Sequence, residues 1–326
     1  MKCNELVKPT SYDDLIEIIK ESNKENKKIH VLGLGKHHVR ESEFDICVST
    51  ELLNSILESS ISDLYVTVQS GVTTKELQAY LSEKNLFFPS SYDGTIGGLL
   101  STNFPSPFSI WFPYPKDLIL GAKIITGDGK LIKSGSKTTK FSSGYKIWKT
   151  LAGTLGTLGV YVELNLKVLP KPEKIVSLKV DRPEEVLYEN PWGIVSTLGS
   201  SGVTHYAIFA GFSTYIERIS KNRESVEGVI HTELECERVF GIVVSRGAEV
   251  QVLEKLSSGV AFYGSGYIRT CDERALSLRD KGYTVIIERG CRENEDCLGY
   301  SYTSLQILKN SLDPNHVLCS GIAFDC

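Results

Sequence analysis

Two glycine-rich stretches carry the residue types and the spacing that could hold a large ligand. The first reads DGTIGGLLSTN over residues 93–103, and the second reads AGTLGTLGV over residues 152–160. Glycine adopts positive φ freely and has no Cβ, so a glycine-rich backbone can approach a planar or anionic ligand closely and offer it bare N–H groups. One such stretch alone could equally serve turns in a sheet protein. Two in one chain favour a ligand site.

Two common nucleotide-binding motifs do not account for these stretches. Neither stretch contains the G-x-x-x-x-G-K-[ST] pattern of a phosphate-binding loop. Neither shows the order of strand, G-x-G-x-x-G and helix within a short βαβ unit that a dinucleotide-binding fold needs. The sequence therefore disfavours a P-loop NTPase and a nicotinamide-dependent Rossmann enzyme.

Length, charge and hydropathy limit the number of domains and the kinds of partner that this chain could have. The chain has 326 residues, a formal net charge of -4 and a pI near 6.0, and this length suggests about two domains. Binding to nucleic acid or to an anionic membrane needs a dense basic face, which the sequence lacks. The opening residues MKCNELVKPTSYDDL have no apolar signal core, and no apolar run is long enough for a membrane span. The sequence predicts a cytoplasmic protein without direct membrane insertion.

The cysteines leave several interpretations open. The chain has 8 cysteines, and four of them, Cys291, Cys297, Cys319 and Cys326, lie close to the C-terminus. Disulfides among these four, free buried thiols, and a metal or iron–sulfur cluster are the alternatives. The spacing matches no cluster or zinc motif, so no metal site is predicted. The single methionine hints at a thermophilic source, in which intracellular disulfides occur.

Local patterns predict a first half of mixed strands and helices. Ser11 or Thr10 is expected to cap an amphipathic helix, and Thr73 and Thr74 lead into a second helix over residues 75–85. Asp128 and Gly129 are typical of a hairpin turn. The expected strands are residues 29–32, 64–68, 118–126, 130–134 and 160–169.

The character of the chain changes at Pro170 and Pro172, which mark a linker. Beyond it, strands are expected at residues 175–180, 204–212, 240–244, 260–268 and 283–288, with helices at residues 184–188, 215–225, 248–257 and 273–278. This order predicts an antiparallel sheet with helices on one face rather than a doubly wound domain. The fold class is therefore α+β.

Seven segments, taken in order, resemble the p-cresol methylhydroxylase-type (PCMH-type) FAD-binding domain of the vanillyl-alcohol oxidase flavoproteins, and most closely the FAD-binding subunit of glycolate oxidase. The segments are GLGKHH (33–38), VTVQSGVTTKEL (66–77), FFPSS (87–91), GTIGGLLSTN (94–103), KDLILGAKIITGDGKLIKSG (116–135), KFSSGYKIWKTLAGTLGTLGVYVELNLKVLPKP (140–172) and LKNSLDPNHVLCSG (308–321). Any one of them is a weak signal, but the ordered set is strong. The resemblance implies a two-subdomain FAD-binding domain over residues 1–172, a short α+β cap over residues 173–290, and a C-terminal segment, residues 291–326, that returns to the FAD domain.

The resemblance also implies where FAD binds. The GLGKHH turn would grip the pyrophosphate through backbone N–H groups, the TIGG segment would line the pyrophosphate and the flavin, and residues 153–160 would run along the isoalloxazine and adenine. The expected FAD-binding residues are Gly33, Leu34, Gly35, Lys36, His37, His38, Gly71, Gly94, Thr95, Ile96, Gly97, Gly98, Ser101, Thr102, Asn103, Gly153, Thr154, Gly156, Thr157, Gly159 and Val160.

The sequence departs from the family pattern at the pyrophosphate loop. Leu34, Lys36, His37 and His38 occupy positions at which relatives carry glycine and small hydroxyl residues. Some relatives attach flavin covalently through a loop histidine, so His37 or His38 could do so here. A role at the surface or facing the phosphates is favoured instead.

Few residues of this sequence match the catalytic residues of the full-length relatives. The paired histidines and glutamate with which full-length relatives bind a metal in the cap are missing, which leaves His205 as a candidate base. Arg269 or Arg246 could pair with a substrate carboxylate, and Tyr145 is expected beside the flavin. The candidate catalytic residues are Tyr145, His205 and Arg269.

Three functional hypotheses follow from the resemblance. The favoured one is an FAD-binding subunit of a glycolate oxidase-like 2-hydroxy acid dehydrogenase complex, which works beside a larger flavoprotein subunit and passes electrons to an iron–sulfur subunit. The second is a self-sufficient FAD-dependent dehydrogenase of unknown substrate. The third is a catalytically silent flavin-fold subunit with a structural or regulatory role.

Overall fold

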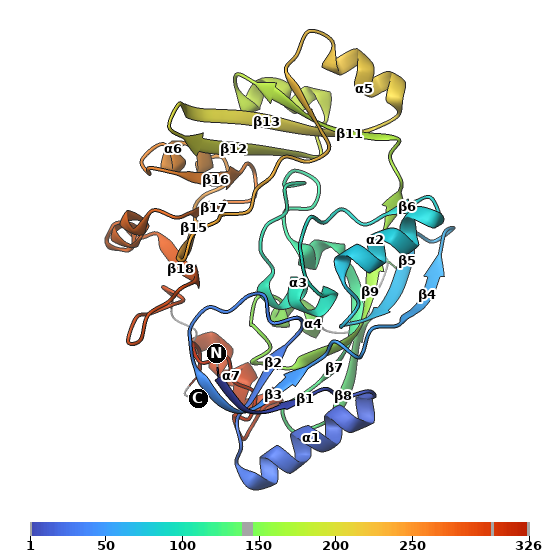
Figure 1. Ribbon diagram of the computed structural model, residues 1–326, viewed down its shortest axis with the longest axis vertical. Helices are drawn as coiled ribbons and strands as arrows, with labels where there is room; N and C mark the ends of the chain where they lie inside the picture. Colours follow the sequence, from blue (N-terminus) through green and yellow to red (C-terminus); the bar gives the residue numbers. More distant parts are fainter. Residues whose placement is uncertain (1, 139–145, 301–302, 325–326) are drawn as a thin grey trace.

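Two parts make up the molecule (Figure 1). One is built on the two ends of the chain, up to β10 and from α7 onward, and is called the FAD-site part because it carries the residues expected to bind FAD; the other, from β11 to β18, is the cap. The computed structural model describes residues 2–138, 146–300 and 303–324. In the view of Figure 1 the cap lies at the top, and both termini lie close together at the bottom. The architecture is α+β, as the sequence predicts.

The first part contains a parallel sheet and an antiparallel sheet. The parallel sheet has the order β1-β3-β2, the antiparallel sheet has the order β4-β5-β9-β7-β8, and β10 pairs with β6. Its elements are β1 (Lys2–Val7), α1 (Tyr12–Glu25), β2 (Ile29–Leu32), β3 (Glu43–Ser49), β4 (Ile56–Ser60), β5 (Tyr65–Gln69), α2 (Thr74–Glu83), β6 (Leu86–Phe87), α3 (Ile96–Thr102), the 3-10 helix η1 (Pro115–Leu118), β7 (Ile119–Ile125), β8 (Leu131–Gly135), α4 (Ile147–Leu151), β9 (Val160–Lys167) and β10 (Leu169–Pro170).

Side-chain caps fix where the first two helices begin. Ser11 accepts a hydrogen bond from the backbone of Asp14, whose carboxylate accepts one from the backbone of Ser11 in return. Thr73 and Glu76 form the same reciprocal capping box at the start of α2. Such caps satisfy N–H groups that the first helical turn leaves without a partner.

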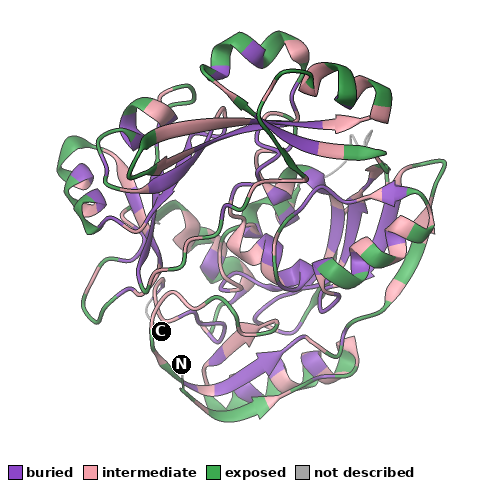
Figure 2. Cartoon of the chain, turned by 45° about the horizontal axis from the view of Figure 1, so that its top comes forward, coloured by how far each residue is buried: buried purple, intermediate pink, exposed green. Residues whose placement is uncertain are grey.

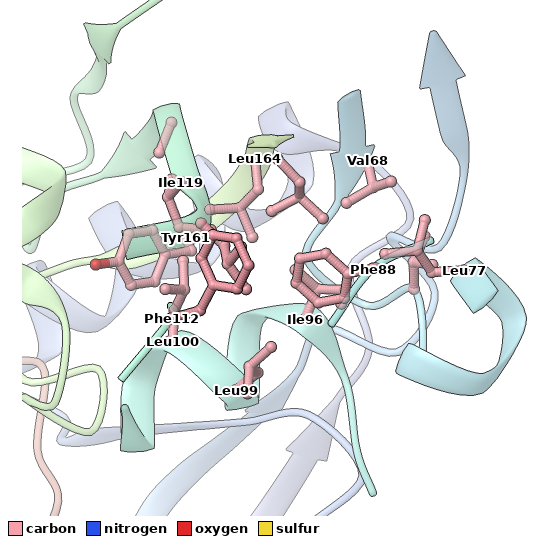
Figure 3. Packing of buried hydrophobic residues seen from close by; sticks show 14 of the residues in the cluster. Val68, Leu77, Phe88, Ile96, Leu99, Leu100, Phe112, Ile119, Tyr161 and Leu164 are labelled. Carbon is pink, nitrogen blue, oxygen red and sulfur yellow. The ribbon is translucent and has the colours of Figure 1, made fainter. Parts of the chain in front are cut away.

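Helix α3 packs on the antiparallel sheet and forms the main core of the FAD-site part. Ile96 and Leu100 lie on the side of α3 that packs against the sheet, where Leu164 of β9 and Val68 of β5 also lie, while Leu99 lies on the side toward the cap (Figure 3). All five side chains are buried. Burial of this apolar face stabilises α3, which has only seven residues and is too short to be stable alone.

The cap is one antiparallel sheet of eight strands in the order β14-β11-β13-β12-β16-β17-β15-β18. Helices α5 and α6 contact this sheet from outside (Figure 1). Its elements are β11 (Lys174–Val180), η2 (Pro183–Glu189), β12 (Gly193–Gly199), β13 (Gly202–Gly211), α5 (Ser213–Ser220), β14 (Ser225–Glu227), β15 (Val239–Val243), α6 (Glu249–Leu253), β16 (Gly259–Phe262), β17 (Tyr267–Thr270), η3 (Glu273–Lys281) and β18 (Thr284–Arg289).

One cap strand expected from the sequence is two strands in the structure. The expected strand over residues 260–268 folds into the hairpin of β16 and β17. Gly264 and Gly266 both have positive φ, 80° and 77°, and this left-handed backbone reverses the chain between the strands. The sequence analysis did not expect β12, which completes the sheet between β13 and β16.

Apolar residues of the cap join the core of the FAD-site part. Val195, Ile208 and Phe262 belong to the same buried cluster as Leu99 and Phe108. Figure 2 shows many buried residues along the strands of the cap sheet, whereas the helices that cover the sheet are largely exposed. The cap is therefore packed on the FAD-site part by a shared core.

The end of the chain lies against β2. Helix α7 (Thr303–Leu312) precedes a segment in which Leu318 forms a parallel bridge with Ile29. The Ile29 N–H donates to Val317 O at 2.8 Å, and the Cys319 N–H donates to Ile29 O at 2.8 Å. The C-terminal segment thus adds a short fourth segment to the parallel sheet, at its edge beside β2.

Disulfides account for the described cysteines. Cys291 is bonded to Cys297, so a disulfide does form among the C-terminal four. Cys319 is also disulfide-bonded, and Cys326 lies outside the described residues. Two bonds that the sequence analysis did not expect join Cys3 to Cys47 and Cys236 to Cys271.

No described helix is long and apolar enough to cross a membrane. In residues 2–138, 146–300 and 303–324, no group of three or more histidine, cysteine or acidic side chains is placed to hold a metal ion.

Candidate functional site

A cavity of about 930 Å³, including its open mouth, lies where β2, α3 and the second glycine-rich stretch meet. Fifteen of the residues expected to bind FAD line this cavity. They are Gly33, Leu34, Gly35, Lys36, His37, His38, Gly94, Thr95, Gly97, Gly98, Ser101, Thr102, Gly156, Gly159 and Val160.

The loop after β2 offers the cavity a row of backbone donors. No hydrogen bond joins the N–H groups of residues 34–38 to an acceptor within the described part of the chain. Gly35 has a φ of 66°, a left-handed conformation that turns successive N–H groups toward one side, as in anion-binding nests. Lys36 forms an ion pair with Asp93 at 2.5 Å on the rim. The loop therefore suits the binding of an anionic group such as a pyrophosphate.

The TIGG segment forms a wall of the cavity but offers it few donors. The Ile96 N–H donates to Val72 O and the Gly97 N–H to Ser70 O, both at 2.8 Å, while the Gly98 N–H donates to the side chain of Thr95. A Cβ at Gly33 would collide with the Oγ1 of Thr95. The glycines here let α3 and the loop after β2, which is expected to bind the pyrophosphate and is called the pyrophosphate loop below, approach each other closely, and the free donors lie in this loop.

The second glycine-rich stretch is a chain of tight turns. Leu155 and Gly156 have φ values of 53° and 78°. The N–H of Gly153 donates to Leu100 O, and the N–H of Leu155 donates to Ser101 O, both at 3.0 Å. These two bonds fix the turns against α3, so that Gly156 and Gly159 face the cavity.

Six of the expected FAD-binding residues lie behind the cavity instead of lining it. Ile96 is a core residue, and the Asn103 side chain accepts a hydrogen bond from the backbone of Lys116. The six support the walls through their packing or hydrogen bonds. They are Gly71, Ile96, Asn103, Gly153, Thr154 and Thr157.

The sequence analysis missed several polar groups of the cavity. His30, Arg40, Tyr92 and Ser320 all line it. Tyr92 directly precedes the first glycine-rich stretch, so its position next to that motif was the available signal. His30 and Arg40 flank the GLGKHH motif in the sequence, so that motif was their available signal, whereas Ser320 reaches the site only through the tertiary fold, because the C-terminal segment meets β2 there.

A second, smaller cavity of about 550 Å³, including its open mouth, lies between the FAD-site part and the cap. His37 and Tyr92 line both cavities, so the two are adjacent. Phe104 and Phe262 give the second cavity an apolar lining, and Arg269 contributes a cation.

Arg269 is held in a defined orientation at this second cavity. Its Nε donates to Glu288 at 2.8 Å, and its Nη1 lies 3.5 Å from Glu233. Tyr267 donates to the other oxygen of Glu288 at 2.9 Å. Burial alone would lower the pKa of Arg269, but the Glu288 and Glu233 carboxylates raise it. No hydrogen bond joins Nη2 of Arg269 to an acceptor among the residues described, which leaves this nitrogen for a ligand.

His37 lies at the junction of the two cavities. Its ring stacks on Tyr92 with 5.1 Å between ring centroids, and Phe104 meets it edge-on at 6.3 Å. Loss of hydration lowers the pKa of His37, and the nearby Arg269 and Arg289 lower it further against the opposing Glu233. At pH 7 the imidazole is therefore neutral. A covalent bond between flavin and His37 or His38 stays the alternative that the sequence analysis did not favour.

The other two catalytic candidates do not join this group. His205 lies on β13, where its Nδ1 is 2.7 Å from Ser196 Oγ, and it lines neither cavity. Burial lowers the pKa of His205. Its place in the cap sheet suits a structural role, whereas Tyr145 lies outside the described residues.

Comparison with known proteins identifies a cofactor of this chain. Residues 4–135 match the FAD binding domain family. This match confirms the PCMH-type resemblance, and the chain carries an FAD-binding domain with FAD as its cofactor.

Curated relatives share this region at low identity. The chain is 32% identical over 142 residues to glycolate oxidase subunit GlcD of Bacillus subtilis, which covers 42% of this chain and 29% of that protein. It is 30% identical over 123 residues to glycolate oxidase subunit GlcE of Escherichia coli, covering 36% of this chain and 35% of that protein. The mitochondrial D-lactate dehydrogenase [cytochrome] of Arabidopsis thaliana is 26% identical over 52% of this chain and 31% of its own length. The matches thus span about a third of these relatives.

The fold as a whole has a solved counterpart. A structure of alkyldihydroxyacetonephosphate synthase superimposes with a TM-score of 0.67 at 14% identity, over 96% of this chain and 75% of that one. This likeness extends the shared fold from the FAD-binding domain to the cap.

The residues present fit FAD. The free N–H groups of residues 34–38 suit the pyrophosphate, and Gly156, with a φ of 78°, allows close approach of a flat ring. Ser320 lines the cavity, and its buried Oγ has no hydrogen-bond partner among the described residues. A bound cofactor would supply the missing partners.

Proposed function

We propose that this chain is an FAD-dependent oxidoreductase that acts on a small 2-hydroxy carboxylate, as the FAD-binding subunit of a glycolate oxidase-like complex. The observation that carries the proposal is the position of Arg269. Its guanidinium keeps Nη2 available in a cavity that shares His37 and Tyr92 with the FAD cavity. A cation held beside a flavin site suits the carboxylate of a small acid.

Each described side chain has a separate part in this proposal. FAD, when bound, supplies the two-electron oxidation. Arg269 would bind the substrate carboxylate, and Glu288 would hold the guanidinium in orientation through its 2.8 Å bond. Phe104 and Phe262 would exclude water from the second cavity. The neutral imidazole of His37 would accept the proton of the substrate hydroxyl, a role that the sequence analysis gave to His205.

The names of the relatives support the substrate class. Relatives from three organisms are named for glycolate or D-lactate. Two of those names are subunit names, which supports a multi-subunit assembly. A larger flavoprotein subunit and an iron–sulfur subunit as electron acceptor are the partners that we propose. A cytoplasmic location is part of the same proposal.

Anaerobic reduction of the bound flavin tests the substrate class. The purified chain, loaded with FAD, is mixed with glycolate or with either enantiomer of lactate, and bleaching of the flavin absorption is followed. We expect bleaching by at least one of these acids. If FAD binds but none of the acids bleaches it, while dithionite does, the substrate class is wrong.

Arg269 variants test the carboxylate site. We expect Arg269→Lys to raise the substrate concentration for half-maximal bleaching at least tenfold, because lysine cannot reproduce the paired guanidinium contacts. FAD binding should stay unchanged. Arg218→Gln, an exposed cap variant that lies over Tyr215 and away from both cavities, is the control. Equal bleaching curves for both variants would contradict the role of Arg269.

Dye-linked turnover distinguishes the three functional hypotheses. Reduction of an artificial electron acceptor by the isolated chain, at a rate that partner subunits do not increase, would indicate a self-sufficient dehydrogenase. A subunit of a complex should bleach with substrate yet turn over rapidly only with its partners. A silent flavin-fold subunit should bind FAD and do neither.

A further inference from the structure

Lys309 and Asp313 form a completely buried ion pair near the end of the chain. The Lys309 Nζ lies 2.6 Å from Asp313 Oδ2, and neither side chain has any exposed surface. Both residues lie outside the segment that matches the FAD-binding family. Replacing a buried ion pair by apolar side chains is often neutral or stabilising, so stability alone is a weak reason for this pair.

The hydrogen bonds of the pair connect two walls of the FAD cavity. Besides Asp313, Lys309 Nζ donates to Thr157 O at 2.9 Å and to Leu318 O at 2.6 Å. Thr157 lies between Gly156 and Gly159, which line the cavity. One ammonium group therefore joins the second glycine-rich stretch to the C-terminal segment, and each of its three protons has an acceptor.

Asp313 fixes the C-terminal segment from the other side. Its Oδ1 accepts from the Val317 N–H at 2.9 Å, and its Oδ2 accepts from the Leu318 N–H at 2.8 Å. These bonds set the path of the chain two residues before Ser320. Leu318 also bridges to Ile29 of β2, the strand that leads into the pyrophosphate loop.

Ser320 is the group that this arrangement brings to the cavity. Its side chain is 8% exposed, and its Oγ has no hydrogen-bond partner among the residues that the structure describes. The residue lines the FAD cavity. A buried hydroxyl without a partner is unfavourable, and a polar atom of a ligand in the cavity would satisfy it.

We propose that Ser320 Oγ is an FAD-binding group and that Lys309 and Asp313 are its positioning pair, which holds Ser320 and the turn at Gly156 in register across the cofactor. The C-terminal segment then completes the FAD site that the first 160 residues begin. The inference concerns only the cofactor and stands whether or not a 2-hydroxy acid is the substrate.

Serine variants test the binding group. The apoprotein is titrated with FAD, and the dissociation constant is obtained from flavin fluorescence. We expect Ser320→Ala to weaken FAD binding roughly two- to tenfold, the effect of one lost hydrogen bond. Ser320→Thr, which keeps a hydroxyl, should restore most of the affinity. Ser311→Ala removes an exposed serine of α7 and should bind FAD as the unaltered chain does.

The ion pair is tested by separating stability from cofactor affinity. Asp313→Asn keeps the shape of the side chain but removes its charge, and Lys309→Met removes the bonds to both walls. Each melting temperature is measured without FAD, and each FAD titration is done well below it. We expect both variants to weaken FAD binding by more than Ser320→Ala does, because Lys309→Met releases both walls and Asp313→Asn leaves the buried Lys309 ammonium without its counter-charge.

The outcomes separate this inference from the alternatives. Unchanged FAD affinity in Ser320→Ala would refute the binding role of Ser320. Variants of the ion pair that melt earlier but bind FAD normally while folded would make the pair merely structural. A chain that binds FAD as expected but that no 2-hydroxy acid bleaches would refute the proposed substrate and leave this inference intact.

Discussion

The guanidinium carbon of Arg269 lies 5.2 Å from the centre of the Phe104 ring. Arg269 belongs to cap strand β17, whereas Phe104 follows α3 in the FAD-site part. A cation–π contact therefore spans the boundary between the two parts, at the wall of the smaller cavity. The substrate cavity that we propose exists only because the cap is docked.

We expect Phe104→Leu to weaken substrate binding about two- to tenfold, because it removes a cation–π contact that helps to orient Arg269. FAD affinity should change little. The measurement is the acid concentration that half-bleaches the flavin. Phe212→Leu, at a ring that is 72% exposed, is the control, and an equal effect in both variants would argue against the contact.

We expect Gly35→Ala and Gly202→Ala to cost similar stability but to differ in cofactor binding. Both glycines have positive φ, 66° and 98°, which costs an alanine about 1–2 kcal/mol. Gly35 lies in the pyrophosphate loop and Gly202 in a cap hairpin. Urea denaturation and FAD titration of both variants check this, and FAD binding that is equally weak in both would refute the role assigned to the loop.

We expect Asp272→Asn to destabilise the protein by about 2 kcal/mol at pH 7, as charged hydrogen bonds are lost. Arg274 holds the pKa of Asp272 well below its usual range, and bonds from Ser257 lower it further. A carboxylate with a lowered folded-state pKa adds stability above its unfolded pKa of about 4, and this stability is lost as pH falls further.

Urea denaturation at several pH values checks this dependence on Asp272. The difference between Asp272→Asn and the unaltered chain should be largest near neutral pH and should shrink steadily below about pH 4. Asp280→Asn, at an exposed position of η3, the 3-10 helix that Asp272 caps, should show little difference throughout. If the difference in the free energy of unfolding between Asp272→Asn and the unaltered chain stayed constant down to acidic pH, the charge of Asp272 would not be responsible.

We expect the double substitution Cys3→Ser with Cys47→Ser to lower the free energy of unfolding by about 2–4 kcal/mol. The bond links β1 to β3 across 44 residues of sequence, and a cross-link of this span restricts the unfolded chain strongly. Thermal unfolding of the variant, with and without reductant, provides the measurement. Peptide mapping without reductant that finds either thiol free would contradict the bond.

The sequence by itself determined most local elements. Capping residues such as Ser11 and Thr73 fix helix starts through bonds only three residues apart. The strand at residues 29–32 and its following glycine turn were also readable, as were the two glycine-rich stretches. Local prediction was wrong at residues 260–268, because glycines at 264 and 266 turn a continuous apolar run into a hairpin.

Only the tertiary structure decided which distant groups share the site. The orientation of Arg269 depends on Glu288, and its cavity depends on Phe104 from the FAD-site part. Ser320 reaches the FAD cavity because Leu318 pairs with Ile29, nearly three hundred residues earlier in the chain. Periodicity and turn chemistry act over a few residues, whereas these contacts arise from packing between sheets, so no local pattern could reveal them.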